Sequence, residues 1–147
     1  MPAETIAIAC DHGGIDMKAL LKADLESAGY EVLDLGTDTL DSVDYPDFAY
    51  ALTAAINDGK SSRGILICGT GIGISIAANR DANIRAAVVH DALSAKLCRE
   101  HNDANVLCLG ARLIGPEVAR DCLNIFLTTE FGGDRHARRV EKLTNPI

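Results

Sequence analysis

RGILICGTGIGISIAANR, residues 63–80, is the stretch that decides how this chain folds. It begins with a short apolar run, continues through three alternating glycines and ends in an alanine-rich segment. This order predicts a buried strand that ends at Cys68, then a glycine loop, then the N-terminus of a helix. Such a junction directs free backbone N–H groups and the positive end of a helix dipole at one place, which favours an anion as the ligand.

Two side chains of this stretch can take part in chemistry. A thiol beside a helix N-terminus, such as that of Cys68, can have a lowered pKa and act as a base or nucleophile. Thr70 adds a hydroxyl inside the loop. The alternative is that Cys68 is a small core residue at the end of its strand, and that the glycines only permit close packing.

The glycine loop does not match the common nucleotide-binding motifs. No Gly-Lys-Ser/Thr follows it, as a P-loop requires, and its G-x-G-x-G spacing fits the dinucleotide pattern G-x-G-x-x-G poorly. Asp91 nevertheless follows the next strand at about the distance expected for a ribose-binding carboxylate. A cofactor-binding role is therefore the second hypothesis.

Composition indicates one globular domain that covers residues 1–147. The chain has 147 residues, 48% of them apolar, and a formal net charge of −7. This size suits one domain with its own core, and the negative charge argues against a nucleic-acid partner. No apolar run approaches the ~20 residues of a membrane span, and the N-terminus lacks a signal segment, so we expect a cytoplasmic protein without a membrane partner.

The cysteines give no sign of a metal site. All five are scattered without a C-x-x-C pair, which predicts reduced thiols and no zinc ligand set. The sequence also shows no motif for a redox cofactor. We therefore expect neither a metal nor a cofactor.

Strand and helix patterns alternate five times along the chain. We expect strands near 6–10, 30–35, 64–68, 84–89 and 106–109, and helices that include 47–57, 92–101, 116–128 and about 134–144. Leu93 and Leu97 are predicted to lie on the inner face of the helix over 92–101, and 37–46 is predicted to be a surface loop. The alternation predicts a three-layer α/β/α, Rossmann-like fold with a five-stranded parallel sheet.

Ligands of such sheets bind beyond the carboxyl ends of the strands, so the residues at those ends are the site candidates. Asp11 and His12 leave the first strand, Cys68 and Thr70 leave the third, and all four converge if these strands are neighbours. Asp11 can instead be the N-cap of the next helix, and His12 can be a loop histidine without a role.

A second set of polar residues ends the fourth helix and occupies the C-terminal one. His101 and Asn102 can form a helix cap and a turn, or part of a site. Arg135 and Arg139 are four residues apart on one helix face, which suits a forked grip on a phosphate, although a charge run is usually only solvated. A phosphate grip, an oxyanion loop, a base and a histidine together suit proton abstraction next to a carbonyl, as in sugar-phosphate isomerisation.

The chain resembles ribose-5-phosphate isomerase type B, in the family that includes galactose-6-phosphate isomerase subunits. The matching pieces are CDHGG at 10–14, DYP at 44–46, GILICGTGIGISIAAN at 64–79, REHND at 99–103, and Arg135-His136 with Arg139-Val140-Glu141. The resemblance implies a metal-independent interconversion of ribose 5-phosphate and ribulose 5-phosphate in the pentose phosphate pathway. It also implies a homodimer or homotetramer whose active site lies between two subunits, and a C-terminal helix that packs on the partner.

The resemblance also implies a role for each matching residue. Cys68 would be the base, assisted by Thr70, because Ile74 stands where another branch of the family has a glutamate. His101 with Asp11 would open the sugar ring. The other implied contacts are of three kinds: the enediolate oxygen would be held by Gly69, Gly71, Ile72, Gly73 and Ile74, the phosphate by His12, Arg112, Arg135 and Arg139, and the sugar by Tyr45 and Asn102.

Three points stay open at the level of sequence. An extra residue in the Gly132–Arg135 segment leaves Arg138 as an alternative to Arg139. The substrate could be another aldose or ketose phosphate, such as allose 6-phosphate, galactose 6-phosphate or a tetrulose phosphate. The hypothesis from another class is a non-catalytic module that binds a nucleotide or a sugar phosphate.

Overall fold

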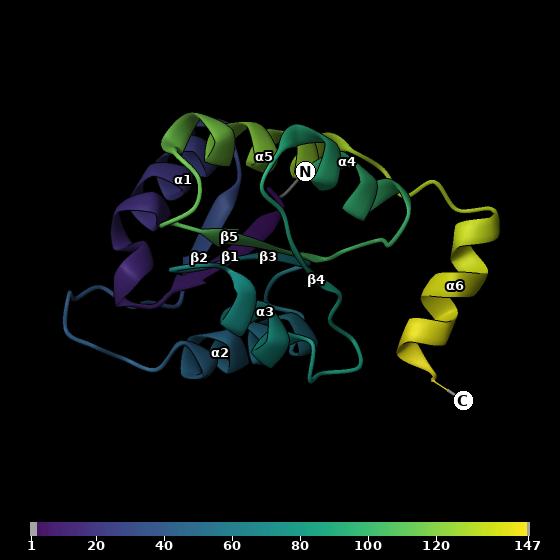
Figure 1. Cartoon of the computed structure of the whole chain (residues 1–147), viewed down its shortest axis with the longest axis horizontal. Helices are drawn as coiled ribbons and strands as arrows, with labels where there is room; N and C mark the ends of the chain where they lie inside the picture. Colours follow the sequence, from purple (N-terminus) through teal and green to yellow (C-terminus); the bar gives the residue numbers. More distant parts are fainter. Residues whose placement is uncertain (1–2, 147) are drawn as a thin grey trace.

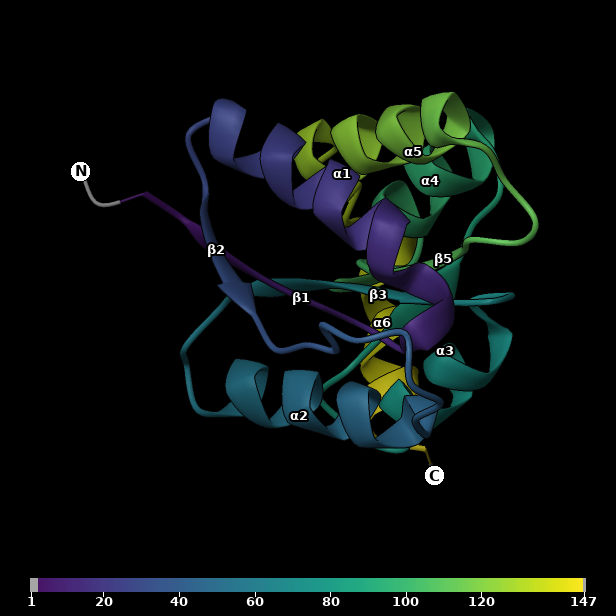
Figure 2. The same cartoon turned by 90° about the vertical axis from the view of Figure 1, so that its left-hand side faces the viewer.

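The computed structural model describes residues 3–146 and contains one five-stranded parallel sheet with the strand order β2-β1-β3-β5-β4. The strands are β1 (Thr5–Cys10), β2 (Glu31–Asp34), β3 (Arg63–Cys68), β4 (Ala86–Val88) and β5 (Val106–Gly110). One face is covered by α1 (Ile15–Ser27), α4 (Ala92–Glu100) and α5 (Pro116–Thr128), and the other by α2 (Tyr45–Asn57) and α3 (Ile72–Ala78) (Figures 1 and 2). The predicted three-layer α/β/α fold is confirmed.

Alternate residues of the central strands enter two separate cores. Ile65 and Ile67 of β3 face the layer of α1, α4 and α5, whereas Leu66 and Cys68 face α2 and α3. This period of two is the expected consequence of a pleated strand that is buried on both faces. Gly64 lets α2 approach closely, because a Cβ atom there would lie 2.6 Å from the Leu52 side chain.

Two local predictions are wrong. Helix α2 begins at Tyr45, inside the predicted 37–46 loop, since Pro46 is tolerated in the first turn of a helix. Leu93 of α4 is 64% exposed, and the buried residues of that helix are Ala95 and Cys98. Each residue turns a helix by about 100°, so Leu93 lies nearly opposite Ala95; Leu97 is only half-buried.

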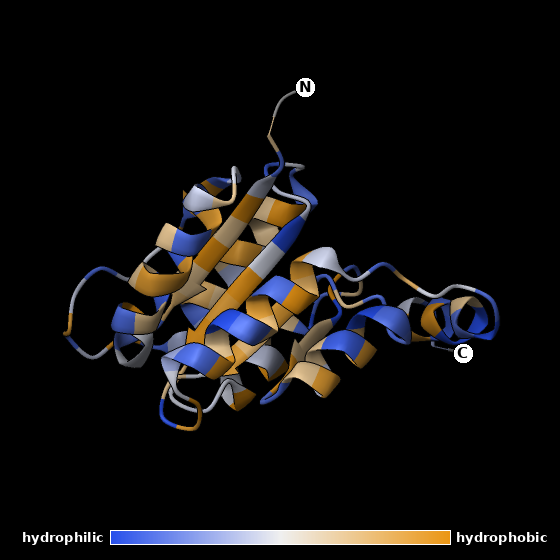
Figure 3. Cartoon of the chain, turned by 90° about the horizontal axis from the view of Figure 1, so that it is seen from above, coloured by the Kyte–Doolittle hydropathy of each residue, from blue (hydrophilic) through white to orange (hydrophobic). Residues whose placement is uncertain are grey.

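The last helix, α6 (Arg135–Thr144), stands away from the body of the molecule (Figures 1 and 3). None of its residues is buried, although Val140 and Leu143 are apolar. It is connected to the body at its start, where the Gly132 N–H donates to the Glu100 carbonyl over 3.0 Å. Within residues 3–146, each helix is too short or too polar to cross a membrane.

Candidate active site

The strand order brings the first group of predicted residues together. Strands β1 and β3 are neighbours, with Cys10 opposite Ile67, and the Asp11 N–H donates to the Ile67 carbonyl over 3.2 Å. The chain leaves β1 toward β2 and leaves β3 toward the other side of the sheet, which makes this point a topological switch. The condition for the convergence of Asp11, His12, Cys68 and Thr70, that β1 and β3 are neighbours, is therefore met.

The Cys68 thiol lies at the start of the glycine loop and is held by it. Its sulfur accepts a hydrogen bond from the Gly71 N–H over 3.2 Å. The residue is 4% exposed and belongs to the apolar cluster that contains Leu66 and Ile74. The N–H contact fits the predicted base, whereas the burial fits the alternative of a core cysteine.

Glycines of the loop allow three neighbours to approach it. Gly71 has a φ of +76°, and a Cβ atom there would lie 2.9 Å from the Leu109 carbonyl carbon. A Cβ on Gly73 would lie 2.5 Å from Tyr45 Cζ, and one on Gly69 would lie 3.0 Å from Arg112 Cδ. The loop is therefore enclosed by the backbone of β5, the Tyr45 phenol and the Arg112 side chain.

Two polar side chains near the glycine loop already make hydrogen bonds, and these bonds show which of their atoms could still bind a ligand. Thr70 Oγ1 accepts the Ile72 N–H over 3.1 Å, which leaves the Thr70 hydroxyl hydrogen free to donate. Asp11 Oδ1 accepts the Gly13 N–H over 2.9 Å, so Asp11 is the N-cap of the short 3-10 turn His12–Gly14, whereas the N-cap of α1 itself is Gly14. We call the set of Asp11, His12, Tyr45, residues 68–74 and Arg112 the carboxyl-edge group.

His101 and Asn102 lie at the opposite end of the sheet. They follow α4, and the chain then enters β5 at Val106. Cys68 pairs with Gly110, at the other end of β5, and four strand residues span about 13 Å. Figure 1 shows the same separation, with the loop before α2 on the left and α6 on the right.

The residues at this second end gather around the start of α6. The rings of His101 and His136 are stacked, with centroids 4.4 Å apart and planes at 17°. Both rings line a cavity of about 260 Å³ together with Asn102, Arg139 and Leu143. Desolvation and the nearby His101, Arg135 and Arg139 lower the pKa of His136. We call His101, Asn102, Arg135, His136 and Arg139 the amino-edge group.

His136 is the residue that the sequence-based site lacks. The sequence does place it in a basic cluster, but only the stacking against His101 shows that it faces the same cavity. Arg135 and Arg138 do not line this cavity, and both are exposed.

Two arginines hold the turn that carries His101 and Asn102. Asp103 adopts a φ of +47°, an unfavourable conformation for a residue other than glycine. Its carboxylate accepts from Arg99 Nη1 over 2.8 Å and from Arg85 Nη2 over 3.4 Å, and its carbonyl accepts from Arg85 Nε over 2.8 Å. These contacts stabilise the turn and orient the two residues before it.

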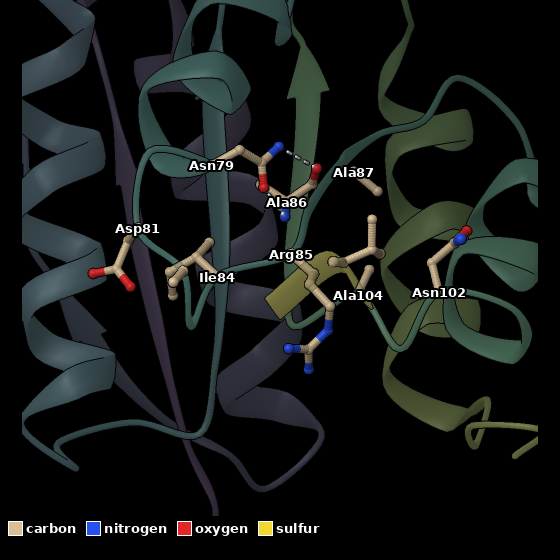
Figure 4. Close-up of a pocket in the computed structure, with 10 residues that line it drawn as sticks. Asn79, Asp81, Ile84, Arg85, Ala86, Ala87, Asn102 and Ala104 are labelled. Carbon is tan, nitrogen blue, oxygen red and sulfur yellow. Dashed lines mark hydrogen bonds between the residues drawn. The ribbon is translucent and has the colours of Figure 1, made fainter. Parts of the chain in front are cut away.

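A larger cavity of about 400 Å³ lies beside β4 and also includes Asn102 (Figure 4). The Asn79 side-chain amide donates to the Ala86 carbonyl over 2.9 Å and accepts the Ala86 N–H over 2.8 Å. Both backbone groups of Ala86, on the edge strand β4, therefore have a hydrogen-bond partner. Leu143 of α6 also lines the cavity. This cavity therefore adjoins the amino-edge group and not the glycine loop.

The structure does not support the dinucleotide hypothesis for Asp91. Its carboxylate caps α4 by accepting the Ser94 N–H over 2.7 Å. Strand β5 lies between β3 and β4, so Asp91 is two strands away from the glycine loop. In a dinucleotide-binding fold the ribose-binding acid ends the strand next to that loop. Within residues 3–146, no group of three or more His, Cys, Asp or Glu side chains is arranged to hold a metal ion.

Known proteins share this sequence and this fold. Residues 6–143 match the profile of a family described as Ribose/Galactose Isomerase. The chain is 46% identical to ribose-5-phosphate isomerase B of Escherichia coli, over 95% of this chain and 93% of that protein. It is 47% identical to the D-erythrulose-4-phosphate isomerase of Pectobacterium atrosepticum, over 95% and 92% of the two chains.

Solved structures agree with these matches. Ribose-5-phosphate isomerase B of Clostridium thermocellum superposes with a TM-score of 0.95 at 48% identity, and the match covers 97% of this chain and 96% of that one. The Mycoplasma genitalium enzyme with bound ribulose 5-phosphate superposes with a TM-score of 0.94 at 36% identity, over 99% and 97% of the two chains.

Proposed function

Because this chain belongs to the ribose/galactose isomerase family, we propose that it is an aldose–ketose isomerase that interconverts ribose 5-phosphate and ribulose 5-phosphate. Relatives with that activity in their names match nearly its whole length. The observation that carries the proposal is the thiol of Cys68 beside the amides of the glycine loop. An isomerase needs a base and an oxyanion site at one place, and these groups can supply both.

The proposed chemistry moves one proton between two carbons. The Cys68 thiolate removes the C2 proton of open-chain ribose 5-phosphate, and the aldehyde oxygen takes up the negative charge of an enediolate. Backbone N–H groups of residues 69–74 stabilise that charge, and the free hydroxyl hydrogen of Thr70 assists. A proton also moves from the C2 hydroxyl to the C1 oxygen, and return of the carbon-bound proton to C1 then leaves the carbonyl at C2, so the reaction needs no net addition of atoms or electrons.

Opening of the sugar ring is assigned to His101 with Asp11, and this assignment requires a second copy of the chain. A proton-transfer group must be within about 3 Å of its target, whereas the two groups of residues are separated by about the length of β5. The proposed assembly is a homodimer, or a homotetramer made of such dimers. In it, the amino-edge group of one copy faces the carboxyl-edge group of the other.

Exposed apolar surface supports this assembly. Helix α6 buries none of its side chains, and Leu143 is exposed on it. Ile72 and Ile76 are exposed on α3, the helix that follows the glycine loop. Contact between copies would cover these residues, and it would bring Arg135 and Arg139 to the same phosphate as His12 and Arg112.

Another sugar phosphate is the alternative substrate for the same isomerisation. The relative named D-erythrulose-4-phosphate isomerase is 47% identical, so a tetrulose phosphate is the second candidate. The reaction is proposed to take place in the cytoplasm, and the five free, buried cysteines fit a reducing compartment.

The test is proton exchange followed by a substrate panel. Ribose 5-phosphate in heavy water should gain deuterium from solvent at C2 when the protein is added, as seen by proton NMR. The values of kcat/KM for ribose 5-phosphate, allose 6-phosphate, galactose 6-phosphate and erythrulose 4-phosphate then identify the substrate. Binding of ribose 5-phosphate without any exchange would favour the non-catalytic module instead.

A further inference from the structure

A loop over residues 36–44 joins β2 to α2 and passes beside Asp11 and His12. The Cys10 N–H donates to the Gly36 carbonyl over 2.7 Å, and the Thr37 N–H donates to the Cys10 carbonyl over 2.8 Å. The start of the loop is thus paired with the last residue of β1, next to the carboxyl-edge group. Its other end leads into Tyr45, whose ring covers Gly73.

A buried ammonium group fastens this loop to the body of the protein. The Lys18 side chain, on α1, is 5% exposed, and its Nζ lies 2.7 Å from Asp34 Oδ1 and 3.0 Å from Asp38 Oδ1. Desolvation opposes the charge on Lys18, but the hydrogen bonds with Asp34 and Asp38 outweigh it, so the pKa of Lys18 is raised. Asp34 also accepts the Gly36 N–H over 3.0 Å, which extends the network into the loop backbone.

The two carboxylates differ in a way that separates their roles. Asp34 is the inner partner, with a side chain 20% exposed, and it balances the buried charge. Asp38 is 81% exposed and lies in the loop, so it is the arm that holds the loop to Lys18. Removal of Asp38 would free the middle of the loop, whose start stays bonded to Cys10 and Asp34, and would still leave Lys18 paired with Asp34.

The far part of the loop determines which nitrogen of His12 carries the proton. The Val43 N–H donates to His12 Nδ1 over 3.2 Å. A nitrogen that accepts a hydrogen bond is unprotonated, so the neutral ring carries its proton on Nε2. His12 can then donate from Nε2 to an anion.

We propose that Lys18 and Asp38 are positioning residues, which hold the 36–44 loop so that Val43 keeps His12 in the form that donates from Nε2 to the substrate phosphate. The ligand part of this inference rests on the proposed function, whereas the protonation of His12 can be measured without any substrate. The two can therefore fail separately.

The test compares Asp38→Ala with a matched control, Asp41→Ala. Asp41 is an exposed carboxylate in the same loop, and it makes no ion pair within the described residues. Lys18→Met and Lys18→Arg form a second pair, in which the arginine keeps the positive charge. Thermal melting identifies any variant that is not folded.

Two measurements on these variants decide the matter. Long-range proton–nitrogen NMR should show His12 protonated on Nε2 in the wild type and Asp41→Ala, and a mixture of both forms in Asp38→Ala and Lys18→Met. The KM for ribose 5-phosphate should rise about tenfold in the latter two, the loss expected for one hydrogen bond to a charged group, with little change in kcat. Lys18→Arg should recover both properties.

An unchanged His12 spectrum in a folded Asp38→Ala protein would overturn the proposal. A wild type without isomerase activity would instead contradict the proposed function, and the NMR result would still decide the role of the loop.

Discussion

A mixture of two inactive variants tests whether the site is shared between chains. Cys68→Ala removes the proposed base from the carboxyl-edge group, and His101→Asn removes the proposed ring-opening acid from the amino-edge group. In the proposed mechanism both groups must reach one sugar ring, yet about 13 Å of β5 separates Cys68 from the start of that strand. Each variant alone should therefore have two defective sites in every dimer.

The expected recovery follows from the arrangement of the two sites. In a mixed dimer, one site combines the intact Cys68 of one copy with the intact His101 of the other, and the second site carries both substitutions. Random pairing of equal amounts makes about half of the dimers mixed, and each has one working site, so about a quarter of wild-type activity should return.

The assay unfolds the two variants together, refolds them, and follows the formation of ribulose 5-phosphate. Native mass spectrometry with one tagged variant confirms that mixed dimers are present. The control mixes Cys68→Ala with Asp11→Asn, because both substitutions lie in the carboxyl-edge group and no mixed dimer then has an intact site. Mixed dimers of Cys68→Ala and His101→Asn that recover no activity would refute the shared site.

Two further predictions concern stability. Gly71→Ala and Gly59→Ala both place a side chain at a φ of +76°, but only Gly71 lies against the backbone of β5, whereas Gly59 faces open space. Gly59→Ala should lower the free energy of unfolding in urea by about 1–2 kcal/mol, and Gly71→Ala should lower it by about 1–3 kcal/mol more. Only Gly71→Ala should also lose activity. Equal losses of stability in the two variants would contradict the close packing of Gly71 against β5. Lys18→Met should cost about 3–5 kcal/mol at neutral pH, because it leaves the half-buried Asp34 without its main partner. Desolvation raises the pKa of Asp34, but the hydrogen bond from Lys18 has the opposite effect, and the net pKa lies below the ordinary value of 3.8. The stabilisation by this ion pair is therefore fully present above pH 3.8 and is lost as the pH falls through the lowered pKa. The difference in urea midpoint between wild type and Lys18→Met should therefore narrow in acid, and a constant difference would argue against the ion pair.

Local patterns predict the elements better than they predict which faces of the helices are buried. The strand, loop and helix expected over 63–80 are present as β3, the glycine loop and α3. The sequence predicts that Leu93 lies on the inner face of α4, whereas the small Ala95 and Cys98 occupy that face. Contact between α4 and its neighbours selects small side chains there, and a single-sequence pattern does not record the partner of a helix.

The sequence by itself determined the isomerase family, the α/β class and the residues that end each strand. Each strand end depends on residue types within one short segment, and the class and the family depend on the order of such segments and motifs along the chain, which periodicity and motif spacing record. Only the tertiary structure decided the strand order, the burial of Lys18 beside Asp34 and the stacking of His101 on His136. It also placed the carboxyl-edge and amino-edge groups at opposite ends of the sheet. Each of these four features depends on packing between segments that are distant along the chain.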